Sequence, residues 1–402
     1  MSNLAEFASK RGDLDHFRDV ATAIAALRPT TPVYALIPKA FRLAAKSFRD
    51  GFPGETMYAV KANHARPVLD QVWAAGIRHF DVASIPEAKA IHERFPDAKM
   101  SFMAPLRLHG AAGEAFRKYG VRDFALDCEE ELGAILRETG GAGDKRVAEQ
   151  LTLYVRVCVP ADGALIELAS KFGASKEHAA RLLKAIAKTG ARPALTFHVG
   201  SQCMKADAFA HALAICGEVI AQAGVAIYGL DLGGGFPGYY ENVVVPPLPA
   251  YFDTIKSGLA ALKLSPNVAI HCEPGRALVA DGVSLITQAI TRRGQMLYIN
   301  DGIYGSLNEY TLKKWPARYP VRVFSPQADG SLRQKQAAPV SFKVYGPTCD
   351  TLDVLHYEIE IPGDVAAGDW IVFDKLGAYS CALRTAFNGF FPDTFVEVDA
   401  AS

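Results

Sequence analysis

The segment ETMYAVKANHARP, residues 55–67, places a lysine where a buried strand should end. Its centre, residues 57–60, is an apolar run that predicts such a strand, and Lys61 follows it directly. An ammonium group is costly to bury, so a lysine at this position needs either solvent or a chemical purpose. A desolvated lysine with a lowered pKa can form a Schiff base with a carbonyl compound. The simpler interpretation is that Lys61 is a solvated strand end.

Polar groups at the ends of other predicted strands could complement this lysine. A carboxylate can partner the ring nitrogen of pyridoxal phosphate, a flat side chain can stack on its ring, and glycine amides with an arginine can hold its phosphate. Each group alone could be a core histidine, a tight turn or a surface ion pair, but their joint occurrence favours the cofactor. The residues are Asp81, Ser84, Glu87, Arg156, His198, Ser201, Gly233, Gly234, Gly235, Glu273, Gly275 and Arg276.

Strand-like and helix-like segments alternate from residue 55 onward. Eight such strands over about 240 residues predict an α/β fold of the (β/α)8 barrel type, in which the C-terminal ends of the strands face one pocket. An open, doubly wound sheet is the alternative. The prolines after GGGFPG argue against dinucleotide binding, because no helix start follows. The predicted strands span 55–63, 79–84, 98–105, 123–128, 151–159, 194–201, 228–236 and 268–276.

The pattern changes after Arg276, where strand-like runs follow one another with few helical windows. This change predicts an antiparallel β domain over residues 277–402. The strand candidate at 31–40 precedes the barrel and is expected to join that domain. We therefore divide the chain into an N-terminal segment (1–38), the barrel (39–276) and the β domain (277–402).

Composition narrows the possible partners. Of the 402 residues, 43 are Lys or Arg and 43 are Asp or Glu, so no net charge attracts nucleic acid or an anionic membrane. The start of the chain lacks a signal-peptide core, and the apolar stretch 206–230 is interrupted by charge, which predicts a cytoplasmic protein outside the membrane. Seven cysteines without paired spacing indicate no disulfide framework, and we expect no metal.

Ten motifs, in order from about residue 33 to 391, resemble the ornithine decarboxylase group. They are YAVKAN, FDVAS, SKFGA, FHVGSQ, DLGGGFPG, EPGR, YINDGIYGS, GPTCD, GDW and GAYS with FNGF. This group consists of pyridoxal-phosphate decarboxylases of fold type III, the alanine-racemase-like barrel followed by a β domain. The resemblance implies pyridoxal 5'-phosphate as cofactor and a head-to-tail homodimer whose subunits share their active sites. The first 30 residues lie outside it.

The same resemblance implies a role for each matching residue. Lys61 corresponds to the Schiff-base lysine, His198 to the residue stacked on the ring and Glu273 to the partner of the ring nitrogen. Cys349 corresponds to the acid that protonates the carbanion, and Asp350 to the residue facing the distal amine of the substrate, both donated by the other subunit. The remaining cofactor residues are Asp81, Glu87, Arg156, Ser201, Gly234, Gly235, Gly275, Arg276 and Tyr379; Tyr304, Glu309 and Phe387 are the remaining substrate residues.

One departure from the group concerns the substrate. A second aspartate for the distal amine is expected within residues 307–320, but the chain there reads LNEYTLKKWPARYP, with Lys313 near the aligned position. Glu309 is the only carboxylate in this segment. The GPTCD motif nevertheless matches the ornithine group closely. We therefore interpret the chain as a decarboxylase of a basic amino acid, L-ornithine or L-lysine, giving putrescine or cadaverine.

Three alternatives stay open. Diaminopimelate decarboxylation or racemisation is one, although diaminopimelate decarboxylases tend to carry Cys-Glu where this chain has Cys349–Asp350. The second is decarboxylation of a related non-standard amino acid, such as a carboxyspermidine-like or siderophore-precursor-like one, with Lys313 or Lys314 facing an acidic distal group. The third is a non-catalytic regulatory homologue, which would be expected to lose cofactor contacts that this chain retains.

Overall fold

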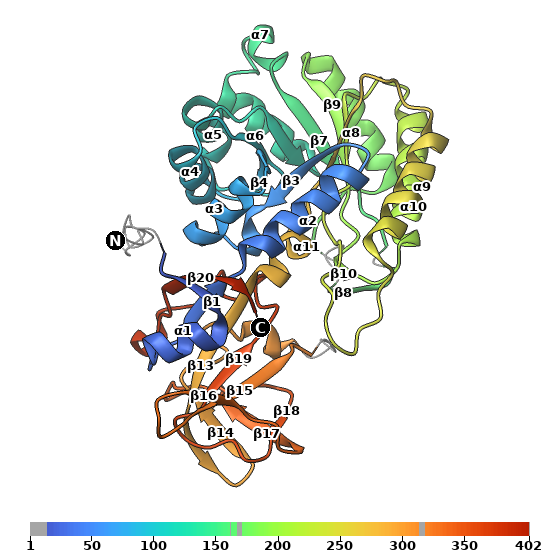
Figure 1. Ribbon diagram of the computed structural model, residues 1–402. Coiled ribbons are helices and arrows are strands. Elements are labelled where there is room, and N and C mark those ends of the chain that lie inside the picture. The colour runs from blue at the N-terminus through green and yellow to red at the C-terminus, as the bar shows by residue number, and fades with distance from the viewer. Residues whose placement is uncertain (1–13, 161, 167–170, 313–317, 402) are drawn as a thin grey trace.

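The barrel predicted from the sequence is present in the computed structural model, which describes residues 14–160, 162–166, 171–312 and 318–401 (Figure 1). Eight parallel strands close into one barrel, and β12 completes the ring by pairing with β3. The prediction of a (β/α)8 barrel is therefore confirmed. In chain order the strands are β3 (Glu55–Ala59), β4 (His79–Val82), β5 (Lys99–Phe102), β6 (Asp123–Leu126), β7 (Thr152–Arg156), β9 (Arg192–Thr196), β11 (Gly229–Asp231) and β12 (Ala269–Cys272).

Helices surround the barrel because each carries one apolar face. In α8 (Lys176–Thr189), Ala179, Leu182, Leu183 and Ile186 are buried at helical spacing, Ser175 caps the start and Gly190 ends the helix. A two-stranded antiparallel sheet, β8 (Ala164–Ile166) with β10 (Ser201–Cys203), lies outside the ring. The other helices of this part are α2 (Pro38–Gly51), α3 (Arg66–Ala74), α4 (Ile85–Arg94), α5 (Ala111–Tyr119), α6 (Glu129–Thr139), α7 (Lys145–Ala148), α9 (Asp207–Ala223), α10 (Leu248–Leu262) and α11 (Arg276–Val279).

A ten-stranded sheet forms the second body of the molecule (Figure 1). Its main path is β1-β20-β2-β13-β14-β17-β18, with β19 pairing with β13 and β15, and β16 pairing with β15. Most pairs are antiparallel, as predicted, but β1–β20, β2–β20 and β14–β17 are parallel, so the sheet is mixed. Its strands are β1 (His16–Asp19), β2 (Val33–Leu36), β13 (Val283–Arg293), β14 (Met296–Ile299), β15 (Val321–Pro326), β16 (Leu332–Gln334), β17 (Pro339–Tyr345), β18 (Ile359–Pro362), β19 (Trp370–Phe373) and β20 (Thr394–Ala400).

Strand β2 reaches this sheet from ahead of the barrel. It pairs with β13 on one side and β20 on the other, so segments from both ends of the chain lie side by side. The helix α1 (Val20–Leu27) connects β1 to β2 and packs its apolar face on the same sheet. The strand expected at 31–40 is thus built into the β domain.

The barrel interior has a small apolar layer between two polar ones. Met57, Met103, Ala125, Tyr154 and Ala194 form the apolar cluster. Residues two positions apart on a strand share a face, so His79 and Asp81 of β4 lie on one face, as do His271 of β12 and Glu273 just after it. Ionisable groups therefore lie toward both ends of the barrel. In the described part of the chain, no helix has the length and apolar character that a membrane span requires.

Candidate active site

Lys61 lies at the C-terminal end of β3, in the short 3-10 turn η2 (Val60–Ala62). Its Nζ is 3.6 Å from Oδ2 of Asp81, which belongs to the neighbouring strand β4. Asp81 is buried, and its other oxygen, Oδ1, has no hydrogen-bond partner among the residues described. A buried oxygen without a partner is costly, so Asp81 retains capacity for a further donor.

The ionisation of Lys61 differs from the sequence expectation. Burial alone would lower its pKa, but the carboxylates of Asp81 and Glu273 outweigh burial and raise this pKa above its ordinary value. The expected lowering of the Lys61 pKa is therefore wrong. Lys61 is held as an ammonium by its neighbours and must give up a proton before it can act as a nucleophile.

Two further buried carboxyl groups, those of Glu273 and Asp231, lie near Lys61. Burial, followed by the charges of Asp231 and Asp81, raises the pKa of Glu273 well above its ordinary value. Asp231 at the end of β11 is fully buried and accepts hydrogen bonds from Thr196 Oγ1 at 2.6 Å and the Gly233 amide at 3.2 Å. Sequence reasoning missed Asp231, although its place in DLGGGF, just before the glycines, could have signalled it.

His198 lies beside this group after β9. The Gly200 amide donates to its Nδ1 at 3.0 Å, so Nδ1 is the acceptor and the proton of the neutral ring lies on Nε2. Burial, then the positive charges of Lys61 and Arg156, lowers the pKa of His198 well below its ordinary value. The planar imidazole ring is therefore uncharged. Arg156, half-buried at the end of β7, lies 5.3 Å from the ring centre of Phe172.

The glycine run after β11 takes conformations that other residues avoid. The φ angles of Gly233 and Gly235 are +61° and +103°. A Cβ on Gly234 would lie 2.7 Å from the Glu273 carbonyl, and one on Gly235 would lie 2.5 Å from the Gly200 carbonyl. Gln202, next to Ser201, fixes the end of the loop because it both donates to and accepts from the backbone of Gly238. Glycine is therefore required here because the loop packs directly against the neighbouring backbone.

Hydrogen bonds tie the Lys61 segment to the β domain. The Tyr379 amide donates to the Ala62 carbonyl at 2.8 Å, and Asn63 Nδ2 donates to the Gly377 carbonyl at 2.8 Å. Tyr379 has a φ of +53°, a conformation that is strained for a bulky residue and typical of functional sites. Gly275 is equally constrained, since a Cβ there would lie 2.7 Å from that of Ala62. Sequence reasoning missed Asn63, which stands two positions after the lysine in KAN.

Arg276 and Glu309 are partners, which differs from the roles that the sequence suggested. Both are buried, and the guanidinium donates to the two oxygens of Glu309 at 2.9 and 2.5 Å. Tyr319 also donates to Glu309, at 2.6 Å, and Arg276 donates to Tyr240 at 2.9 Å. Because its carboxylate is paired in this way, Glu309 is not placed to bind the distal amine of a substrate. The structure instead makes it a support for Arg276.

Glu87 has a helix-capping role in the structure. Its Oε2 accepts from the Ala83 amide at 2.7 Å, while the Glu87 amide donates to Oγ of the N-cap residue Ser84 at 3.4 Å, so both side chains bind backbone amides at the start of α4. Burial raises the pKa of Glu87 to about 7. The charge of Asp81 acts in the same direction, so Glu87 still belongs to the surroundings of that aspartate.

Four of the predicted residues of the β domain form a separate group. Tyr304 donates to Asp350 Oδ2 at 2.5 Å, and the Tyr304 and Phe387 rings are 4.8 Å apart. Cys349 is exposed, and its amide donates to the side chain of Asn388. A backbone hydrogen bond from Leu352, then the Tyr304 hydroxyl, lowers the pKa of Asp350, so this carboxylate is ionised. Lys313 and Lys314 lie outside the described residues.

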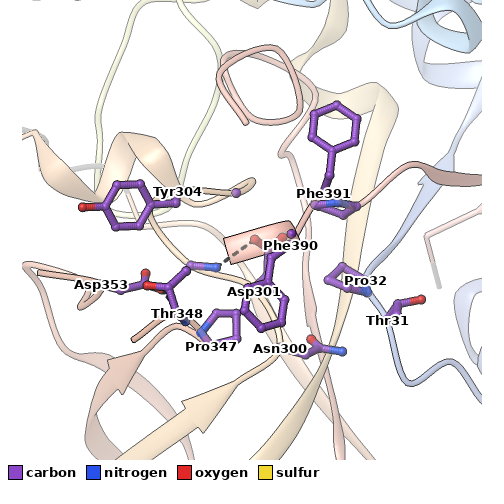
Figure 2. Close-up of a pocket in the computed structure, with 14 residues that line it drawn as sticks. Thr31, Pro32, Asn300, Asp301, Tyr304, Pro347, Thr348, Asp353, Phe390 and Phe391 are labelled. Atoms are coloured by element: carbon purple, nitrogen blue, oxygen red, sulfur yellow. Dashed lines mark hydrogen bonds between the residues drawn. The ribbon is translucent and has the colours of Figure 1, made fainter. Parts of the chain in front are cut away.

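A cavity of about 140 Å³ adjoins this group (Figure 2). In Figure 2, Tyr304, Thr348 and Asp353 lie on one side, and Pro32 and Phe391 lie on the other. The cavity thus lies between the GPTCD loop and residues 389–392 near the C-terminal end of the chain. Its lining residues are Thr31, Pro32, Asn300, Asp301, Gly302, Tyr304, Gly305, Pro347, Thr348, Asp353, Gly389, Phe390, Phe391 and Pro392.

Comparison with known proteins gives matches over most of the chain. The pyridoxal-binding domain of the pyridoxal-dependent decarboxylases matches residues 34–280, and the C-terminal sheet domain of these enzymes matches residues 277–377. The lysine/ornithine decarboxylase of Selenomonas ruminantium is 33% identical over 344 residues, which cover 83% of this chain and 81% of that protein. Antizyme inhibitor 2 of Xenopus laevis is 28% identical over 364 residues, covering 83% of this chain and 73% of that protein.

A solved structure shows the same architecture. The lysine/ornithine decarboxylase of Vibrio vulnificus, complexed with cadaverine, superposes with a TM-score of 0.79 at 25% identity. The superposition covers 95% of this chain and 100% of that one, so it includes both the barrel and the β domain.

Proposed function

Because the chain belongs to the pyridoxal-dependent decarboxylases, we propose that it removes the α-carboxyl group of a basic amino acid, L-ornithine or L-lysine. The product would be putrescine or cadaverine. The observation that carries this proposal is the barrel end itself, where Lys61 lies 3.6 Å from a buried aspartate with an unpartnered oxygen. Glycine backbone and a neutral histidine ring adjoin the same place.

These residues fit pyridoxal phosphate. Lys61 would hold it covalently, His198 would stack on its ring and Glu273 would face its ring nitrogen. The backbone of the 233–235 loop, with positive φ angles at Gly233 and Gly235, would supply amide groups to the phosphate. When bound, the cofactor supplies an electron sink for the electron pair that remains after CO2 departs.

The charges at this end of the barrel favour a cationic ring. Asp81, Asp231 and Glu273 are buried within reach of one another, and burial raises the pKa of Glu273. A protonated ring nitrogen brought to Glu273 would offset this crowding and stabilise its carboxylate. Glu273 would in turn keep the proton on that nitrogen, which the reaction requires.

The final proton needs an acid, and we assign this role to Cys349 of a second copy of the chain. Cys349 is exposed in the single chain, whereas a proton donor for a carbanion works best where water is excluded. Exposed aromatic residues adjoin its loop: Phe387, Phe390 and Phe391 are 41%, 45% and 41% exposed. A twofold dimer that buries this face would bring Cys349 and Asp350 to the barrel of its partner.

A complementation experiment tests this sharing of sites. Lys61→Ala and Cys349→Ala should each be inactive, but random mixing of equal amounts should give half heterodimers with one intact site of two. Roughly a quarter of wild-type activity should return, as expected for a closed twofold dimer. Mixing Lys61→Ala with the double variant Lys61→Ala/Cys349→Ala is the matched control and should restore nothing. No recovery while labelled subunits demonstrably exchange would show that each site comes from one chain.

The substrate is assigned from Asp350. It is ionised and held by Tyr304, and Glu309 is paired with Arg276, so Asp350 is the carboxylate left in this group for a distal ammonium. The test is CO2 release by the holoenzyme from L- and D-ornithine, L- and D-lysine, L-arginine, diaminopimelate and L-glutamate. Rapid release from L-ornithine or L-lysine supports the proposal.

Other outcomes of this panel are equally clear. CO2 release from an amino acid that carries a distal carboxylate or a modified distal group would contradict a basic substrate. It would support decarboxylation of a related non-standard amino acid. Release from none by protein that carries the cofactor would favour a regulatory role, a possibility raised by the antizyme inhibitor relative.

A further inference from the structure

Three ligand-type side chains meet at the end of the barrel opposite Lys61. Glu55 and His79 are the first residues of β3 and β4, and His271 lies on β12 directly opposite Glu55 in the strand register. Because β3 lies between β12 and β4, the three residues come from adjacent strands. They stand far apart in the sequence, so no spacing motif connects them.

We propose that Glu55, His79 and His271 bind one divalent transition-metal ion of the Zn²⁺ class. The His79 Nδ1 atom is 3.3 Å and the His271 Nε2 atom 3.6 Å from Oε2 of Glu55, and all three ligand atoms lie within 4.8 Å of one another. Zinc binds nitrogen and oxygen at about 2.0–2.2 Å, so two of its tetrahedral ligands are roughly 3.4 Å apart. The two measured separations match this spacing.

The hydrogen bonds of His79 supply an independent reason. His79 Nε2 is 2.8 Å from Ser101 Oγ, and Ser101 donates its only hydroxyl proton to Asp123 at 3.1 Å. Nε2 must therefore carry the imidazole proton, which leaves a lone pair on Nδ1. Nδ1 is buried without a hydrogen-bond partner in the described part of the chain, and it faces a carboxylate oxygen. A cation between the two atoms would relieve this repulsion.

The surroundings resemble those of metal-bound histidines. Such residues usually donate their second ring N–H to a fixed acceptor, and the chain from His79 through Ser101 to Asp123 does this. His271 has a weaker counterpart, since its Nδ1 is 3.5 Å from the Tyr154 hydroxyl. Two imidazoles with one carboxylate are a known zinc set and do not suit Ca²⁺ or Mg²⁺, which prefer oxygen ligands throughout.

One further cation adjoins the site. Lys99 Nζ lies 3.1 Å from Oε1 of Glu55 and is largely exposed, so it can turn away into solvent when an ion binds. Glu55 itself is 39% exposed, which gives the ion a path of entry and leaves a coordination position for water. The ion would join β12, β3 and β4, and thus strengthen the closure of the barrel. This inference is independent of the proposed decarboxylase activity.

The experiment uses the cofactor-loaded protein after treatment with EDTA and dialysis. Zn²⁺ is added alone, and its uptake is measured by elemental analysis and calorimetric titration, with Tm as a second readout. We expect one ion per chain and a Zn²⁺-dependent rise in Tm. His79→Ala and His271→Ala should each weaken Zn²⁺ binding by more than the roughly 10- to 100-fold typical of losing an outer-sphere partner. His211→Ala, which removes an exposed histidine elsewhere, is the matched control and should change neither readout.

Glu55→Gln provides a variant that should fold even if the buried histidines cannot be replaced, because Glu55 is partly exposed. It should also bind Zn²⁺ weakly. Uptake of well under one ion by the wild type, or uptake that these variants do not reduce, would overturn the proposal. The cluster would then be a metal-free ion pair in which His79 is protonated.

Discussion

Strands β4 and β12 connect two groups of ionisable residues that differ in charge balance. Toward the N-terminal end, the imidazoles of His271 and His79 lie beside one carboxylate, Glu55, and lower its pKa. Two positions further along the same strands, Asp81 and Glu273 face each other's charge, and burial raises the pKa of Glu273. Residues two apart on a strand are separated by only about 7 Å. The two polar layers on either side of the apolar one thus shift the pKa of a carboxyl group in opposite directions.

The difference indicates which end requires a ligand for its charge balance. Burying carboxylates with too few cations is costly, and proteins keep such arrangements mainly at functional sites. The N-terminal cluster can be balanced by its own histidines and Lys99, or by a metal. The C-terminal group is balanced only in part by Lys61 and Arg156, so a cationic cofactor ring would complete it. Four substitutions test this contrast.

Lys61→Ala should have the largest effect. Activity should fall by at least about 10⁴-fold because the covalent attachment of the cofactor is lost. In the wild type, borohydride reduction should leave the cofactor on the peptide that contains Lys61. Lys89→Ala, at an exposed position on α4, is the control and should retain full activity. Cofactor found on another lysine would remove Lys61 from the site.

Glu273→Gln should lower kcat by roughly 10²- to 10³-fold, the size of effect seen when one electrostatic group of an active site is removed. It should also raise the Tm, because an uncharged amide relieves the crowding with Asp231 and Asp81. Steady-state kinetics and calorimetry on the same preparation measure both. A fall in both kcat and Tm would contradict the claim that the charge of Glu273 serves the reaction at a cost in stability.

Glu87→Gln should stabilise the protein in a pH-dependent way. Folding raises the pKa of Glu87 to about 7, so the folded state binds a proton that the unfolded state releases. The resulting cost is full above pH 7 and disappears as the pH falls toward the unfolded pKa of about 4.3. Glutamine keeps the capping hydrogen bond. The gain in unfolding free energy should reach about 3 kcal/mol at pH 8 and be less than half as large at pH 5.5.

Urea unfolding at the two pH values measures this gain, and Glu93→Gln, at an exposed position in the same helix, is the control. An equal gain at pH 8 and pH 5.5 would mean that folding does not raise the pKa of Glu87.

Ser101→Ala should have the smallest effect and should act on stability alone. It removes the hydrogen bonds to His79 and Asp123 at the N-terminal end, for a cost of about 1 kcal/mol in unfolding free energy. The decarboxylase activity should stay within about twofold, since the apolar layer separates this serine from Lys61. Measurement in EDTA excludes any contribution from metal. A large loss of activity would show that the two ends of the barrel are coupled.

Much of the fold could be predicted because periodicity and turn residues are local signals. The eight barrel strands and the position of Lys61 after β3 follow from such signals. The parallel pairs of β20 with β1 and β2 do not, since they join segments from opposite ends of the chain. The pairing of Arg276 with Glu309 was missed because a side chain's partner depends on tertiary packing.

The cofactor residues were easier to propose than the charges they carry. Motifs located Lys61 and Glu273, but the direction of a pKa shift depends on burial and on every neighbour. Asp231 and Asp81 influence Glu273, and only the folded barrel brings them together. The cluster of Glu55, His79 and His271 has no sequence signal for the same reason, since strand register alone unites it.

The placement of β2 between β13 and β20 has a consequence for synthesis on the ribosome. Strand β2 emerges early, but its neighbour β20 is made more than three hundred residues later, which at roughly 5–20 residues per second takes some tens of seconds. The barrel can fold during this interval, whereas the β sheet cannot be completed until β20 has emerged. Tyr379, whose amide holds the turn that carries Lys61, also emerges late. The nascent chain therefore lacks this hydrogen bond until synthesis is nearly finished.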